Sequence, residues 1–189
     1  VTTELTDRMN AAYDSIPGNP LHLEPEKLRV HMAKEVTNLE RSILLEEMAY
    51  GNVLHLYAPD KGDLSDNVIW KGSAGYFDEM PKIFKLSKIN LNITLKCIQS
   101  GIPLRALDIL SAGGFLLSNY QPELAEYFVD GEDVVLYYSL EDALQKSIYY
   151  LQHEEERKRI AENGYKKVKA LFGYEDRLRE LFAIAELPL

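Results

Sequence analysis

The sequence predicts an α/β fold, in which a parallel sheet is flanked by helices, with an N-terminal helical segment and C-terminal helices. Short runs rich in β-branched and aromatic residues alternate with segments of helical periodicity from about residue 52 to residue 138. Such alternation builds right-handed βαβ units, whose strands are parallel and whose helices cover both faces of the sheet. After residue 138 the pattern is helical only.

The first fifty residues are predicted to be helical. Residues 3–15 have a weak helical pattern, and the Pro and Gly residues of 17–20 interrupt it. A long helix then begins at Pro25, a residue that suits a first helical position, and reaches about Met48. Its apolar residues recur every three or four positions and form one stripe: Leu28, Met32, Val36, Leu39 and Ile43. If its own domain leaves this stripe uncovered, a homodimer would cover it.

The remaining elements follow in the order that the alternation requires. A turn-rich segment separates the first two strands, and each of the three later strands is followed by a helix. The predicted strands are 52–58, 67–72, 89–95, 114–118 and 133–137. The predicted helices are 77–87, 103–112, 122–128, 139–151, 154–171 and 174–185.

Composition indicates one globular domain and argues against several classes of function. Of the 189 residues, 46% are apolar and 27% are charged, which is enough for one packed core but not for two α/β domains. The net charge of -9 argues against nucleic acid as a partner, because phosphate backbones need a basic face. A small phosphorylated ligand needs only a helix terminus and a few cations. The single cysteine and the scattered histidines indicate neither a disulfide nor a metal site.

No apolar run approaches the length of about 18 residues that a transmembrane helix needs. The first residues also lack the basic and apolar regions of a secretion signal. From these two observations we expect a cytoplasmic protein.

Several unusual residues are predicted to gather where ligands bind in open parallel sheets, outside the carboxyl ends of the strands. They end a strand, precede one, or open the helix that follows one: Lys71, Gly72, Thr94, Gly113, Gly114, Pro122 and Glu123. Each also has a simpler interpretation. An exposed lysine, a glycine pair that ends a helix and a glutamate in a first helical turn are all common in proteins without a site.

Arg105 and Asp108 lie three residues apart, on one face of the helix that begins near residue 103. A carboxylate can accept hydrogen bonds from both hydroxyls of a ribose, and a guanidinium can bind a diphosphate through two hydrogen bonds. The pair therefore suits a nucleoside diphosphate. The alternative is a surface ion pair worth about 0.3 kcal/mol, and spacing alone leaves both interpretations open.

Residues 53–181 resemble the C-terminal half of group 1 glycosyltransferases of the GT-B fold, in particular the branch related to spore maturation proteins. Four segments carry the resemblance: "VIWKGSAGYFDEMPKIFKLSKINLNIT", "SGIPLRALDILSAGGFLLSNYQPELAEYF", "DGEDVVLYYSLEDAL" and "EEERKRIAENGYKKV". The resemblance implies a Rossmann-like domain at 51–189 that binds a nucleotide-diphosphate sugar, such as a UDP-sugar, as donor substrate. It further implies that residues 1–50 lead in from a missing N-terminal acceptor domain, that the isolated fragment is inactive, and that no metal or cofactor is needed.

The same resemblance assigns roles by position. Asp108 stands where the family has a ribose-binding Glu, and Gly113 stands where a Gly closes that motif. Lys71 and Gly72 fall near the phosphate-facing turn, and 122–123 fall in the loop near the diphosphate. Ser100 stands where many relatives have a Glu that contacts the donor sugar.

The serine at this position leaves the sugar and the catalytic residue open. It also leaves an alternative open, a noncatalytic Rossmann-like module in spore or envelope assembly. A nucleotide-sugar epimerase of the same architecture is a third, less favoured interpretation, because it requires a paired catalytic half.

Overall fold

The computed structural model describes residues 3–18, 24–98 and 100–186. Each predicted helix and strand is present in these ranges, although the strands are shorter than predicted. Of the predicted break at 17–20, residues 19 and 20 lie outside the described residues. In chain order the elements are α1 (Thr3–Asp14), α2 (Pro25–Ala49), β1 (Leu54–Leu56), β2 (Val68–Trp70), α3 (Met80–Leu86), β3 (Asn90–Asn92), α4 (Leu104–Ser111), β4 (Leu116–Asn119), α5 (Pro122–Tyr127), β5 (Val135–Tyr137), α6 (Leu140–Gln152), α7 (Glu154–Leu171) and α8 (Tyr174–Ile184).

All ladders between the named strands are parallel, as predicted. β1 pairs with β2, and a second sheet has the order β3-β4-β5, with Leu91 opposite Leu117 and Leu117 opposite Val135. The described strands thus form two sheets rather than the single sheet that the sequence predicts. Side chains join them, because Leu54 of β1 and Leu91 of β3 pack against the same apolar clusters.

The three-stranded sheet is buried on both faces, as expected for parallel strands covered by helices. Leu117 and Val135 face one layer, where Leu44 of α2 and Tyr150 of α6 complete the cluster. The alternate strand residues face the other layer: Leu116, Val134 and Leu136, packed with Ala106, Ile109 and Leu110 of α4, Leu124 and Phe128 after β4, and Val168 of α7. The period of two along the strands therefore assigns one helical layer to each face.

α7 approaches α4 and the start of β5 very closely at Gly164. A Cβ atom placed on Gly164 would lie 2.4 Å from the backbone oxygen of Asp133 and 2.7 Å from Cδ2 of Leu110. Only a residue without a side chain fits between these neighbours. The glycine therefore sets the distance at which α7 packs on the domain.

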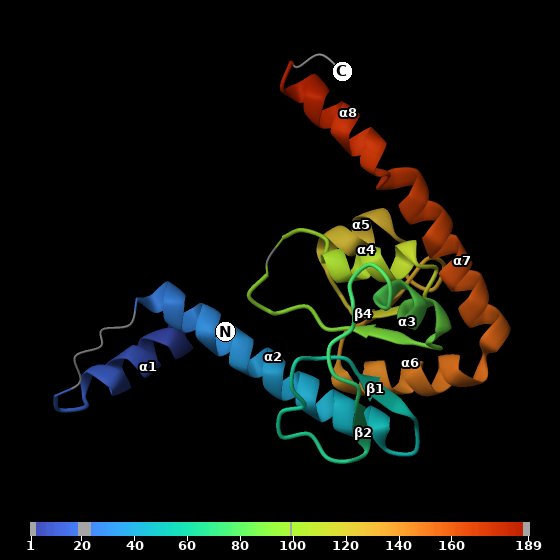
Figure 1. Ribbon diagram of the computed structural model, residues 1–189. Helices are drawn as coiled ribbons and strands as arrows, with labels where there is room; N and C mark the ends of the chain where they lie inside the picture. The colour runs from blue at the N-terminus through green and yellow to red at the C-terminus, as the bar shows by residue number, and fades with distance from the viewer. Residues whose placement is uncertain (1–2, 19–23, 99, 187–189) are drawn as a thin grey trace.

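The long helix α2 belongs to the domain only in its second half. Leu44 and Met48 lie in the core, whereas the first half projects from the domain together with α1, on the left of Figure 1. Leu28 of the predicted stripe is buried and Met32 is partly buried, but the prediction is wrong for the rest, since Val36, Leu39 and Ile43 are all exposed. Beyond Leu28, the residues that are buried along this helix lie on a different face: Ala33, Thr37, Leu44, Leu45, Met48 and Ala49.

The middle of α2 contacts the loop that leaves β3. Thr37 Oγ1 accepts a hydrogen bond of 3.1 Å from the backbone N–H of Lys96, and Arg41 Nη2 donates to the carbonyl of Ile93 at 3.3 Å. Lys96 also forms an ion pair of 2.8 Å with Glu40. The middle of α2 is thus attached to the carboxyl edge of the three-stranded sheet.

At the other end of the chain, α8 continues beyond α7 and points away from the sheets, at the top of Figure 1. None of the helices in the described ranges combines the length and the apolar character that crossing a bilayer requires.

Candidate functional site

Side-chain amides hold the exits of β3 and β4 together. Asn92 Nδ2 donates to Thr94 Oγ1 at 3.1 Å and to Ser118 Oγ at 2.9 Å, and the N–H of Thr94 donates to Asn119 Oδ1 at 2.8 Å. Asn92, Thr94 and Ser118 are all buried. Thr94 lies at the edge where the sequence places it, and its contacts fix the shape of the two loops.

Asp108 lies about 6 Å along α4 from the first residue of that helix, on its half-exposed face. The Tyr76 hydroxyl donates to Asp108 Oδ1 at 3.0 Å, and this bond together with the carboxylate charge raises the pKa of Tyr76 above its usual value. Arg105 Nη1 is 3.9 Å from Asp108 Oδ2, with 46% and 27% of the two side chains exposed. Because this ion pair is long and partly solvated, it contributes little to stability.

The Arg105 guanidinium is directed toward α3. Its Nη1 lies 3.4 Å from Met80 Sδ, and its central carbon is 5.5 Å from the centroid of the Phe84 ring. Within the described residues, Asp108 Oδ2 accepts no hydrogen bond, so one carboxylate oxygen is available to a ligand. The helical ion pair that the sequence offered as an alternative is present, and Tyr76 is a second, closer partner of Asp108.

Tyr76 belongs to a loop, residues 71–79, that leaves the end of β2. Gly72 has φ +77°, which favours glycine, and the N–H of Gly75 donates to Glu79 Oε2 at 2.6 Å. Lys71 is exposed and forms no ion pair with another described residue. Lys71 and Gly72 therefore belong to the same loop as the tyrosine that binds Asp108.

Two other predicted positions lie on segments that follow β3 and β4. Ser100 is exposed and lies between β3 and α4. Pro122 begins the short helix α5, and Glu123 follows it. The Glu123 Oε2 atom is enclosed and has no hydrogen-bond partner among the described residues. Such an atom costs free energy unless a ligand, a water molecule or a proton satisfies it.

The structure does not bring Gly113 and Gly114 to this edge. They lie between α4 and β4, at the amino end of the strands, because a crossover helix runs antiparallel to the strands that it connects. Gly113 has φ +71°, and the N–H groups of both glycines bond to carbonyls of the last helical turn. A Cβ atom on Gly114 would lie 2.6 Å from the oxygen of Phe84. Both glycines end the helix and allow close packing.

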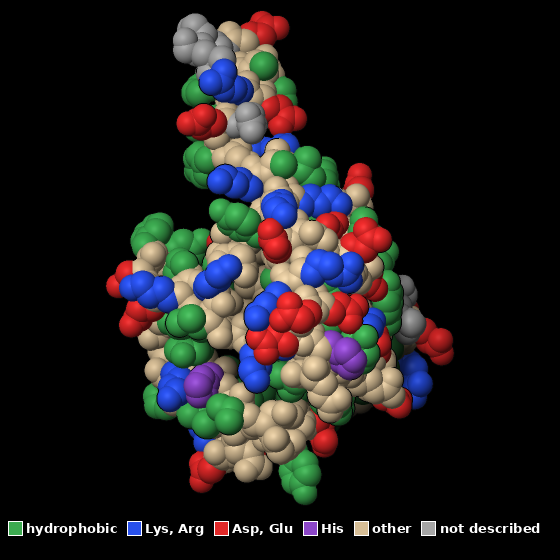
Figure 2. Space-filling view, turned by 90° about the vertical axis from the view of Figure 1, so that its right-hand side faces the viewer, with side chains coloured by type: hydrophobic (Ala, Val, Ile, Leu, Met, Phe, Trp, Pro, Cys, Tyr) green, Lys and Arg blue, Asp and Glu red, His purple; other side chains and the backbone are tan. Residues whose placement is uncertain are grey.

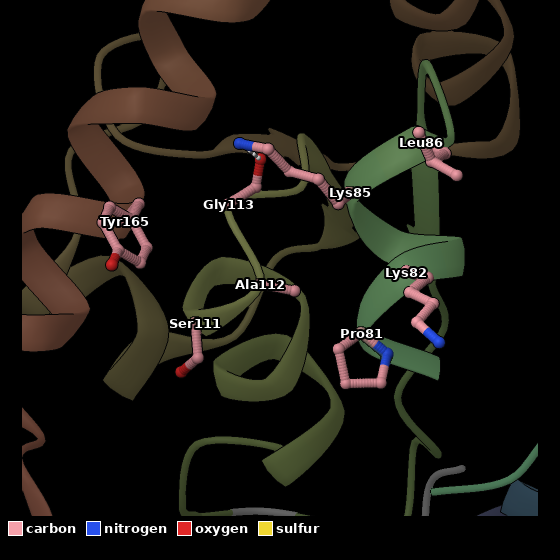
Figure 3. Close-up of a pocket in the computed structure, with 8 residues that line it drawn as sticks. All are labelled: Pro81, Lys82, Lys85, Leu86, Ser111, Ala112, Gly113 and Tyr165. Atoms are coloured by element: carbon pink, nitrogen blue, oxygen red, sulfur yellow. Dashed lines mark hydrogen bonds between the residues drawn. The ribbon is translucent and has the colours of Figure 1, made fainter. Parts of the chain in front are cut away.

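Two open hollows lie at this amino edge, with volumes of about 630 and 540 Å³. Figure 3 shows the first, in which Lys85 reaches over Gly113 and Tyr165 of α7 lies across from Pro81 and Lys82 of α3. Gly113 is the one predicted site residue in their linings.

The adjoining face along α7 carries acidic and basic side chains in alternation, as Figure 2 shows. Lys158 pairs with Glu154 at 2.6 Å and Lys166 with Glu162 at 2.7 Å, so these charges largely compensate one another. The linings of the two hollows nevertheless hold more cations than carboxylates: Lys82, Lys85, Lys88, Arg157 and Lys158 against Glu154 and Glu162. In the described ranges, no three His, Cys, Asp or Glu side chains gather in a way that could hold a metal ion.

Sequence reasoning missed three tyrosines. Tyr76 is 32 residues from Asp108, and no local pattern connects the two. Tyr120 and Tyr138 directly follow β4 and β5, and their rings stack with centroids 5.2 Å apart. For Tyr120 and Tyr138 the available signal was their position directly after a predicted strand.

These features define an open α/β domain of the Rossmann-like class, with polar and aromatic side chains at the carboxyl ends of its parallel strands. Residues 41–183, more than half of the chain, match the family described as glycosyl transferase-like, and the chain belongs to this family. The match begins within α2, consistent with the packing of its second half in the core.

A solved structure supports the same fold. The C-terminal domain of a glycosyl transferase group 1 family protein (LpcC) from Francisella tularensis superimposes with a TM-score of 0.56 at 16% sequence identity, over 76% of this chain and 82% of that chain. The predicted α/β fold class is thereby confirmed. No match was found among curated proteins.

Proposed function

We propose that this domain binds a nucleotide-diphosphate sugar and that the enzyme transfers the sugar to an acceptor bound by a second domain. The family supports transferase chemistry, and the noncatalytic alternative is not favoured. The observation that carries the proposal is the Asp108 carboxylate, which is half-exposed and oriented by Tyr76, with Oδ2 free of hydrogen bonds from the described residues. A carboxylate placed in this way can accept hydrogen bonds from both hydroxyls of a ribose.

In this proposal Asp108 accepts hydrogen bonds from the ribose, and Tyr76 fixes its orientation. Lys71 or Arg105 stabilises the negative charge that develops on the leaving diphosphate. Loss of such a cation would raise the barrier by about 2–4 kcal/mol, by analogy with oxyanion sites. Arg105 would have to turn away from Met80, whereas Lys71 has no ion pair to break within the described residues.

The test is calorimetric titration of the protein with UDP, GDP and ADP at about 1 mM. We expect weak binding of at least one nucleotide, and Asp108→Ala should weaken it because the ribose loses its acceptor. Asp108→Asn keeps the shape and removes the charge, so it should also weaken binding. Asp63→Ala, which removes an exposed carboxylate from the turn before β2, is the matched control. Absence of binding by all three nucleotides would refute the proposal.

Four finer inferences from the sequence remain predictions. They are the spore maturation branch, the cytoplasmic location, the independence from metal and the homodimer. An assay of sugar transfer by the full-length enzyme, with and without a chelator, tests both transferase activity and metal dependence. The products of that assay identify the sugar and the acceptor.

A further inference from the structure

Two tyrosines form an exposed aromatic pair at the carboxyl ends of β4 and β5. Tyr120 is the first residue after β4, and Tyr138 is the first after β5. Their rings stack at 5.2 Å between centroids with 25° between planes, and 42% and 65% of the two residues are exposed. Both rings therefore keep open surface at the edge where ligands bind in sheets of this kind.

Hydrogen bonds from their backbone N–H groups fix the positions of both tyrosines. The N–H of Tyr120 donates to the Tyr137 carbonyl at 2.9 Å, and the N–H of Tyr138 donates to Asp142 Oδ2 at 3.0 Å. The Lys146 ammonium lies 5.5 Å from the centroid of the Tyr138 ring and donates to the same Asp142 carboxylate. Because these bonds fix the backbone and one cation, a ligand would meet rings that are already ordered.

Hydrogen-bonding groups lie next to the pair in sequence. Gln121 directly follows Tyr120 and is buried, and Glu123 carries the enclosed oxygen that lacks a partner in the described part of the chain. Exposed aromatic surface, followed in the sequence by one carboxylate oxygen that lacks a partner among the described residues, would suit a ligand that has one face of C–H groups and hydroxyls around its rim. Saccharide rings have this structure, and their weakly positive C–H groups suit the negative face of an aromatic ring.

We propose that Tyr120 and Tyr138 form a platform that binds the apolar face of a saccharide ring. This inference rests on the proposed function for its context, since the saccharide is either the sugar of the donor or the acceptor. The platform is made of other residues than Asp108 and Tyr76, which lie on α4 and on the loop after β2.

The experiment compares Tyr120→Ala, Tyr138→Ala and the corresponding Phe variants with the unmodified chain. Calorimetry with UDP and UDP-glucose tests the donor sugar, and saturation-transfer NMR with cellobiose and a panel of methyl glycosides in the presence of UDP tests the acceptor. We expect the Ala variants to weaken saccharide binding by about threefold to tenfold in one of the two arms. The Phe variants should retain it, and the affinity for UDP itself should not change.

The matched control is Tyr149→Ala. Tyr149 is 44% exposed and stacks on His153 at 3.8 Å, but it lies in α6, away from the strand ends. This variant should bind saccharides normally, and melting temperatures check that each variant is folded.

The outcomes separate the two proposals. Saccharide binding that is equal in the Ala variants and the unmodified chain overturns the platform and leaves nucleotide binding untouched. Absence of saccharide binding by the unmodified chain in both arms also overturns it. If the chain binds no nucleotide but still binds glycosides through the tyrosines, the proposed function fails and the platform is supported.

Discussion

Replacing Gly164 by alanine sets two opposing effects against each other. In the interior of an exposed helix, Gly→Ala stabilises by about 1 kcal/mol, because glycine loses more backbone entropy. Here the new methyl group would meet the Asp133 oxygen at 2.4 Å and Leu110 at 2.7 Å. The leucine can rotate, but the carbonyl belongs to the backbone before β5 and cannot yield without moving that segment.

The balance of these effects predicts a loss of stability. Overpacking of a close core contact costs about 1–3 kcal/mol, and a backbone contact below 3 Å belongs at the upper end of that range. After subtraction of the helical gain, we expect the free energy of unfolding to fall by about 1–2 kcal/mol. For a chain of this length that corresponds to a decrease of about 2–8 °C in melting temperature.

Urea denaturation followed by circular dichroism measures this change, with the slope m as a check on two-state behaviour. Glu155→Ala in the same helix is the control, because its side chain is 93% exposed and its removal should change stability by less than about 0.5 kcal/mol. A Gly164→Ala variant that is as stable as the unmodified chain, or more stable, would refute the argument that backbone contact sets the position of α7.

Two further predictions concern α2 and the strand exits. Glu46 accepts hydrogen bonds from the backbone and the hydroxyl of Ser65, and these bonds lower its pKa below 4.5. Their contribution to stability is complete above pH 4.5 and is lost as the pH falls through the lowered pKa. The difference in melting temperature between the unmodified chain and Glu46→Gln should therefore shrink in acid, and a difference that stays the same would contradict the assignment. Asn92→Ala removes two buried hydrogen bonds and should cost about 2 kcal/mol in urea denaturation, whereas Asn67→Ala, at an exposed position, should cost less than about 0.5 kcal/mol; equal losses would contradict the role of the amide network.

The order of elements could be predicted because each strand and helix has a local signal. Periodicity and turn residues identified every helix and strand of the described ranges, including the short helix α5 with Pro122 in its first turn. The buried face of α2 could not be predicted in the same way. Thr37 is buried there because its hydroxyl bonds to the Ala33 carbonyl and accepts from Lys96, 59 residues away, while the apolar Val36 and Leu39 face solvent.

The candidate site was predictable only in part, for a similar reason. Arg105 and Asp108 are neighbours on one helix, so spacing brought them together. The closer partner, Tyr76, comes from a different loop, and its contact depends on how β2 and α4 are arranged in three dimensions. Gly113 was grouped with the strand exits although it follows a crossover helix, and the direction of that helix carries it to the opposite edge of the sheet.

The attachment of α2 to the β3 loop has a mechanical consequence. One end of this helix is embedded in the core, its middle bonds to the chain at Ile93 and Lys96, and its far half extends beyond the domain with α1. Because a helix is stiff, a displacement of the outer half of α2 would be transmitted along the helix to the part that is held in the core. Any body that tilts the outer half of α2 would displace the start of the loop that carries Ser100, so motion at a distance would reach the rim of the candidate site through two hydrogen bonds and one ion pair.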